Sequence, residues 1–176
     1  MPKGFTHFYF GDGKGKTTAA LGLALRASGY GKKIVIVQFL KDLKCGELDS
    51  LELLQGVTVY RGKSSGAVFV RDMNNEEKAE TKEIHDENLK KALKLHEEGK
   101  CDMLILDEAF DAYHLGLLDA AMFEGLLKNK PGQLELVITG HNPDTKLFEW
   151  ADYITEMVKR KHPYDIGIAA RKGIEF

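Results

Sequence analysis

The sequence predicts an α/β protein whose mainly parallel central sheet is covered by helices on both faces. Short apolar runs of four to seven residues recur along the chain, and segments of helical composition lie between them. The runs lack a regular apolar–polar alternation, which is typical of strands buried on both faces. Strands that alternate with helices indicate right-handed crossovers and parallel pairing. The 176 residues are enough for one domain, which we expect to span residues 1–176.

Six apolar runs are the predicted strands. The second run, KIVIVQF, is the richest in β-branched residues, and the third, VTVY, is the weakest. In chain order, the predicted strands are residues 5–10, 33–39, 57–60, 103–106, 134–139 and 153–157. The predicted helices between them are residues 17–28, 75–98, 119–128 and 144–150.

The longest predicted helix, NEEKAETKEIHDENLKKALKLHEEG, is dense in charged residues. Its acidic residues lie early and its lysines late, as the helix dipole favours, and Gly99 is typical of a residue that ends a helix. Leu89, Ala92, Leu93 and Leu95 would form its buried side. We interpret the charged side as a solvated face; a docking surface for a charged partner is the alternative.

Composition narrows the function classes. The net charge of −2 and the isoelectric point near 6.3 give no overall positive field for binding nucleic acid or an anionic membrane. Cys45 and Cys101 are isolated in the sequence, so we expect reduced thiols rather than a disulfide or a metal site. No apolar run reaches the ~20 residues of a membrane span, and we expect a cytoplasmic protein.

A glycine-rich loop follows the first predicted strand in the segment FYFGDGKGKTT. Phe10 stands where the usual phosphate-loop pattern has its first glycine, and glycines stand at positions 11, 13 and 15 instead. Such glycines can turn backbone N–H groups toward an anion, and the helix that follows directs its positive end to the same place. Lys16 would add a charge to the phosphates, and the Thr17 hydroxyl can bind Mg²⁺. The alternative is a plain glycine-rich turn with surface lysines.

The segment MLILDE, residues 103–108, supplies a second element of the same site. It delivers Asp107 and Glu108 to the carboxyl edge of the predicted parallel sheet, where ligands gather, and carboxylates can hold Mg²⁺ directly or through water. The alternative is that Asp107 only caps the next helix. Together the two elements predict a domain that binds a nucleoside triphosphate.

Four segments resemble, in order and spacing, the P-loop ATP:corrinoid adenosyltransferases. They are GDGKGKTTAALGLALRASGYGKKIVIVQFLK, LILDEAFDAYHLGLLD, VITGHNP and KHPYDIGIAARKGIEF. The resemblance implies a P-loop NTPase (RecA-like) fold. It also implies transfer of the 5′-deoxyadenosyl group of ATP to the Co(I) centre of a corrinoid such as cobalamin, with release of inorganic triphosphate, in adenosylcobalamin synthesis or salvage. An electron-donating reductase of the flavoprotein type and a homodimer are the implied partners.

The resemblance also implies roles for individual residues. Lys16, Thr17 and Glu108 would be catalytic, and Thr17, Asp107 and Glu108 would bind Mg²⁺ or Mn²⁺. The residues that it places around ATP and the corrinoid are Gly11, Asp12, Gly13, Lys14, Gly15, Lys16, Thr17, Thr18, Arg26, Gln38, Lys41, Phe69 and His141. For Arg26, an exposed helix residue without a functional role is the alternative.

Two segments depart from the family pattern. In the segment GAVFV, Ala67 and Phe69 stand where the family commonly has phenylalanine and tryptophan, and His141 stands where it usually has arginine. Two other functions stay open, the first because of the altered GAVFV segment and the second because phosphate loops of this kind also suit it. One is a carrier or sensor that binds ATP or a corrinoid without turnover, and the other is an ordinary P-loop ATPase or kinase.

Overall fold

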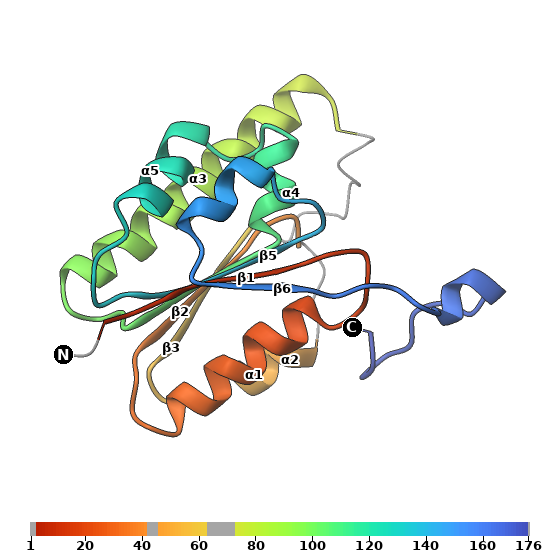
Figure 1. The fold of residues 1–176 in the computed structure, drawn as a ribbon, viewed down its shortest axis with the longest axis horizontal. Coiled ribbons are helices and arrows are strands. Elements are labelled where there is room, and N and C mark those ends of the chain that lie inside the picture. The colour runs from red at the N-terminus through yellow and green to blue at the C-terminus, as the bar shows by residue number, and fades with distance from the viewer. Residues whose placement is uncertain (1–2, 42–45, 63–72, 176) are drawn as a thin grey trace.

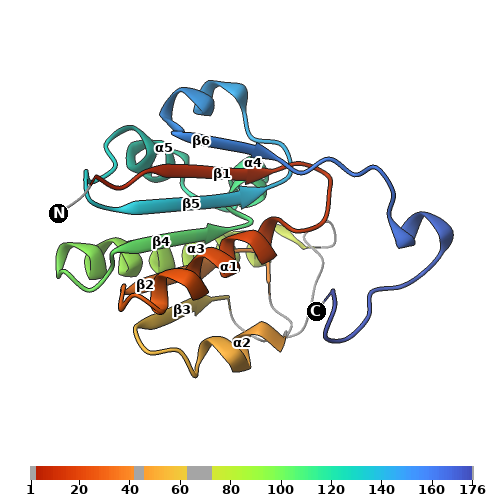
Figure 2. The same cartoon turned by 60° about the horizontal axis from the view of Figure 1, so that its bottom comes forward.

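A computed structural model describes residues 3–41, 46–62 and 73–175 of the chain. They contain a six-stranded sheet in the order β3-β2-β4-β5-β1-β6, and every neighbouring pair of strands is parallel (Figure 2). The strands are β1 Thr6–Phe10, β2 Ile34–Gln38, β3 Val57–Arg61, β4 Met103–Asp107, β5 Glu135–Gly140 and β6 Tyr153–Glu156. The predicted α/β class and the parallel sheet are confirmed.

Helices cover both faces of this sheet, as Figure 1 shows. One face carries α1 Lys16–Ser28 and α2 Gly46–Leu51. The other carries α3 Asn75–Glu97, α4 Ala109–His114, α5 Ala120–Lys128 and the 3₁₀ helix η2 Thr145–Trp150. A short 3₁₀ helix, η3 Pro163–Ile166, lies in the C-terminal segment.

The side chains of the central strands alternate between two apolar clusters. Ile34 and Ile36 of β2 lie in the cluster under α1, whereas Val35 and Val37 lie in the cluster under α3. All five residues of β2 and all five of β4 are buried. The absence of polar alternation in these two runs therefore has the predicted cause, because both of their faces are covered.

The strand β6 differs from the prediction of buried strands. All four of its residues are exposed, because β6 lies at the edge of the sheet and pairs only with β1 among the described strands. A run of apolar residues can also belong to an edge strand, where one side of the backbone ladder is open.

Helix boundaries agree with the sequence where capping residues mark them. Asn74 and Glu77 form a capping box at the start of α3, and Gly99, at φ 68°, follows its end. Asp119 caps α5 and Asp144 caps η2. Residues 145–150 form a 3₁₀ helix rather than an α-helix, and the sequence did not predict α2 or α4.

The segment after β6 leaves the body of the protein and returns toward the glycine loop (Figure 1). Nearly all of its side chains are exposed. The N–H of Lys159 donates to Asp12 Oδ1 at 2.8 Å, and Lys14 Nζ lies 3.6 Å from Glu175 Oε1. We call residues 158–175 the tail.

Trp150, the single tryptophan of the chain, ends η2 and packs against the larger apolar cluster. Phe148, two residues earlier, makes ring contacts with Phe8 and Phe10 of β1. Both rings thus attach η2 to the apolar core and the sheet. Within the described part of the chain, no helix is both long enough and apolar enough to cross a bilayer.

Candidate active site

The glycine loop connects the carboxyl end of β1 to the amino end of α1. Gly11 and Gly15 have φ angles of 113° and 115°, a region that side chains with a Cβ rarely adopt. Gly15 is the N-cap of α1, and the N–H of Ala19 donates to its carbonyl. The N–H groups of the first turn, from Lys16 onward, precede this bond and have no partner within the helix. They and the helix dipole form an anion-binding end.

Gly11 and Gly13 are required for a different reason from the one predicted. Their N–H groups donate to the carbonyls of His141 and Met157 at 2.8 and 2.6 Å, so in this conformation they do not line an anion nest. A Cβ on Gly11 would lie 2.4 Å from the Met157 oxygen, and one on Gly13 would lie 2.6 Å from it. Glycine therefore permits the close approach of the backbone that follows β6.

Lys16 closes over the loop that precedes it. Its ammonium donates to the carbonyls of Gly11 and Gly13 at 2.8 and 2.9 Å. Burial lowers the pKa of Lys16, and the negative charges of Asp111 and Glu108 oppose that shift. These two bonds hold a cation at the centre of the loop, where it can meet phosphate oxygens.

Asp107 joins four elements at the carboxyl edge of the sheet. Its buried carboxylate accepts hydrogen bonds from the hydroxyls of Thr17 and Thr139 on Oδ1, both at 2.8 Å. On Oδ2 it accepts from Lys41 Nζ at 2.6 Å and Gln38 Nε2 at 3.2 Å. Glu108, not Asp107, is the N-cap position of α4, and it makes no side-chain cap bond. The alternative that Asp107 only caps a helix is therefore wrong.

The proposed metal ligands lie around one point, and a cation already occupies that point. Lys41 Nζ lies 2.6 Å from Asp107 Oδ2, 3.1 Å from Thr17 Oγ1 and 3.6 Å from Glu108 Oε1. A hydroxyl and two carboxylates are hard oxygen ligands of the kind that Mg²⁺ prefers. The donor set therefore fits a divalent cation, with the Lys41 ammonium in its place here.

For Glu108 and for Lys41, burial and the neighbouring charges act on the pKa in opposite directions, and the pKa of each group is raised. Burial raises the pKa of Glu108, and the nearby Lys41 ammonium partly offsets that effect. For Lys41, burial alone would lower the pKa, but the charges of Asp107 and Glu108 outweigh it and raise the pKa. Lys41 is therefore a stable cation at neutral pH.

His141 contacts the glycine loop with its backbone, and its ring faces an acidic side chain. Its carbonyl accepts the Gly11 N–H, and its Nδ1 lies 3.0 Å from Asp111 Oδ1. The sequence did not single out Asp111 or Thr139. The signals were present, because Asp111 lies in the first turn after β4 and Thr139 near the end of β5, at the edge where ligands gather.

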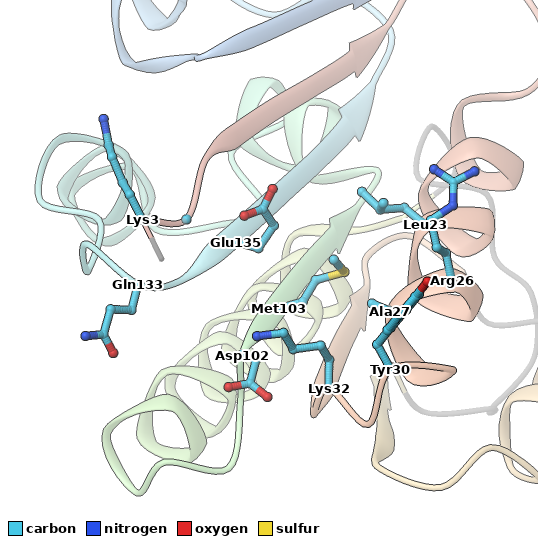
Figure 3. A pocket seen from close by; sticks show the side chains of 11 residues that line it. Lys3, Leu23, Arg26, Ala27, Tyr30, Lys32, Asp102, Met103, Gln133 and Glu135 are labelled. Carbon is cyan, nitrogen blue, oxygen red and sulfur yellow. The ribbon is translucent and has the colours of Figure 1, made fainter. Parts of the chain in front are cut away.

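Arg26 is not brought to this cluster. It lies in the last turn of α1 and lines a cavity of about 340 Å³ at the opposite edge of the sheet, near the starts of β4 and β5 (Figure 3). Leu23, Tyr30 and Met103 also line this cavity. The structure thus separates Arg26 from the predicted nucleotide site. Phe69 lies outside the described residues.

Known proteins resemble this chain over almost its full length. A family model described as "ATP:corrinoid adenosyltransferase BtuR/CobO/CobP" matches residues 2–176. A protein of a Sinorhizobium species named "Corrinoid adenosyltransferase" is 33% identical over 176 residues, which cover 99% of this chain and 81% of that protein. One of the same name from Escherichia coli K12 is 31% identical over 175 residues, covering 99% and 86%. "Corrinoid adenosyltransferase CobA" of Salmonella typhimurium LT2 is 31% identical over 182 residues, again covering 99% and 86%.

Proposed function

The chain belongs to the ATP:corrinoid adenosyltransferase family, a family of enzymes that act on ATP and a corrinoid, and from this premise we propose its reaction. The reduced Co(I) centre of a corrinoid attacks the 5′ carbon of ATP. The cobalt electron pair forms the cobalt–carbon bond, the carbon–oxygen bond breaks, and triphosphate leaves whole with that bond's electrons. Cobalt ends formally as Co(III). The reaction would serve adenosylcobalamin synthesis or salvage.

One observation supports this proposal beyond the family match: the carboxyl edge gathers the Lys16 and Lys41 ammonium groups and the N-terminal end of α1, which together can neutralise a polyphosphate. Lys16 and the first turn of α1 would bind the phosphates there. Triphosphate gains negative charge as it departs, and preformed cations and N–H groups stabilise such charge. The nucleophile comes with the second substrate, so the chain's task is binding and orientation.

We place a divalent cation, Mg²⁺ or Mn²⁺, between Thr17, Asp107 and Glu108. When bound, it would screen the phosphate charges. Asp107 is held by four side-chain donors and therefore orients the Thr17 hydroxyl, while Glu108 faces the same point from the start of α4. Gln38 and Lys41 extend the site from the end of β2.

Two partners complete the proposal. Co(I) needs a strong reductant, so an electron-donating reductase, of the flavoprotein type, must supply it. A homodimer is supported by the exposed edge strand β6, on which Tyr153 and Ile154 are 51% and 47% exposed, because open strand edges with apolar side chains favour pairing with another chain.

The reaction is tested by anaerobic visible spectroscopy of the purified protein with chemically reduced cobalamin and ATP. We expect the Co(I) spectrum to change into that of a light-sensitive alkyl cobalt product, with one triphosphate formed per turnover. Lys16→Ala should abolish the change, because it removes the cation at the centre of the loop.

Two other outcomes would contradict the proposal. Accumulation of ADP and phosphate would identify an ordinary P-loop ATPase or kinase. Tight binding of ATP and cobalamin with no alkylation under strong reduction would identify a carrier or sensor.

A further inference from the structure

The ammonium of Lys41 touches each of the three side chains that we assign to the metal. Its distances to Asp107, Thr17 and Glu108 are 2.6, 3.1 and 3.6 Å. The contact is built by the backbone, because Leu40 before it has a φ of 56° and Glu108 has a φ of 61°, and these are the two non-glycine residues with positive φ in the described ranges. Strained residues that are held in place often mark functional sites.

The buried Asp107 carboxylate requires a neighbouring cation, which must be an ammonium when no metal is bound. Asp107 has no exposed surface, and the side chain of Lys41 is only 20% exposed. A buried carboxylate without a counter-charge is costly, so its removal from water must be balanced by a nearby cation. Lys41 Nζ lies within 3.6 Å of Thr17 Oγ1, Asp107 Oδ2 and Glu108 Oε1, so a metal bound to these three oxygens would lie against the ammonium. Two adjacent cations repel each other, and the ammonium in its present position and a metal on these oxygens therefore exclude each other.

Gln38 leaves one buried acceptor of this cluster open to a further partner. Its Nε2 donates to Asp107 at 3.2 Å, while its Oε1 is buried and has no hydrogen-bond partner among the described residues. The carboxylate fixes this orientation of the amide, because the reverse would set two acceptors against each other. Buried acceptors are normally paired, so this oxygen is available to a donor on a ligand or to a water molecule.

We propose that Lys41 is a resident counter-ion at the metal position, and that a divalent cation enters only by displacing its ammonium. This inference rests on the metal site of the proposed function. The displacement would make binding of the metal alone weak. Bound nucleotide would favour the displacement, because the freed Lys41 ammonium stays at the same edge of the sheet and can pair with phosphate oxygens.

The test is a titration of the full chain with Mn²⁺ alone, followed by electron paramagnetic resonance of the free ion. We expect Lys41→Met to bind Mn²⁺ at least tenfold more tightly than the unmodified protein, because no ammonium competes. Lys100→Met is the matched control, since Lys100 pairs with Glu98 at an exposed turn away from the site, and it should behave as the unmodified protein.

Thermal melting gives a second readout that does not depend on activity. Without metal, Lys41→Met should melt below the unmodified protein, because Asp107 loses its cation, and saturating Mn²⁺ should restore most of the difference. Lys41→Gln keeps a donor for Asp107 without the charge, so it carries the same expectation if Lys41→Met does not fold.

If Lys41→Met and Lys41→Gln bound Mn²⁺ no more tightly than the unmodified protein, the counter-ion role of Lys41 would be overturned, while the metal site would stand. If the unmodified protein bound no Mn²⁺ even with ATP present, the metal assignment itself would fall, and this inference with it.

Discussion

Asp107 shows how one residue can hold the candidate site together. Its four hydrogen bonds come from side chains on α1, on β2 and after it, and on β5. Asp107→Asn would present an amide N–H₂ to some of these donors and remove the charge that faces Lys41. We expect a loss of about 3 kcal/mol in the free energy of unfolding, as for breaking a buried ion pair. Urea unfolding measures it.

The control for this substitution is Glu98→Gln, which breaks an exposed pair with Lys100. Its unfolding midpoint should stay that of the unmodified protein, because exposed pairs contribute little. An Asp107→Asn protein as stable as Glu98→Gln would show that the buried carboxylate does not organise the site.

Glu108 carries a prediction about pH. Burial raises its pKa in the folded protein, so the folded state disfavours the ionised form. Its contribution to stability is therefore present below the unfolded pKa and is lost as the pH rises through the folded pKa. Glu108→Gln should melt at a higher temperature than the unmodified protein at pH 7.5, and the gap should shrink toward pH 4. A gap that widens in acid would contradict this sign.

Individual site residues differ in how far the sequence could predict them. Thr17 and Asp107 were predicted together because the ends of parallel strands meet at one edge, and their hydroxyl and carboxylate do meet. The role of Gly13 was not, because it depends on Met157 approaching from 144 positions later in the chain. Arg26 was predicted at the nucleotide site from its position in the motif. It lies in the last turn of α1 instead, at the other end of the helix from the glycine loop.

At the scale of elements, α1 offers a matched pair of glycine substitutions. In Gly13→Ala, just before the helix, the new Cβ would meet the Met157 carbonyl at 2.6 Å. We expect a loss of about 1–3 kcal/mol, the usual cost of overpacking, together with weaker ATP binding. Both follow from pushing the loop away from the backbone after β6.

Gly22→Ala, inside the exposed side of α1, should do the reverse. A Cβ there meets nothing within 4 Å, so the protein should gain roughly 0.5–1 kcal/mol from the restricted unfolded chain. Chemical unfolding and ATP titration of both variants decide the matter. Equal effects of the two alanines would contradict the steric role of Gly13.

Long or capped elements were predictable, and short ones were not. The α3 helix has 23 residues and a capping box, so its sequence contains enough helical turns for the apolar periodicity to be recognised. The α2 and α4 helices have six residues each, less than two turns, and form because the sheet positions them. Strand order was also outside the reach of the sequence, because pairing depends on the whole sheet rather than on any one run.

At the scale of the whole molecule, the tail contacts the glycine loop while burying little of itself. A protein ending at residue 157 should therefore melt within a few degrees of the full chain, as expected when few buried contacts are lost. Its affinity for ATP should fall several-fold, because Asp12 and Lys14 lose their partners Lys159 and Glu175. Calorimetry and ATP titration test the two halves separately. Unchanged affinity would show that the tail does not order the loop.

That residues 1–176 form one domain stays a prediction.

The position of Trp150 has a practical consequence. All indole fluorescence of this chain arises from one place, the end of η2, where the ring packs against the larger apolar cluster. The same short helix carries Phe148, whose ring contacts Phe10 on the strand that leads into the glycine loop. Transfer of this ring to water on unfolding should shift its emission to longer wavelength. Every denaturation described above can therefore be followed without an added label, and quenching of the same signal by a coloured corrin ring would report its arrival nearby.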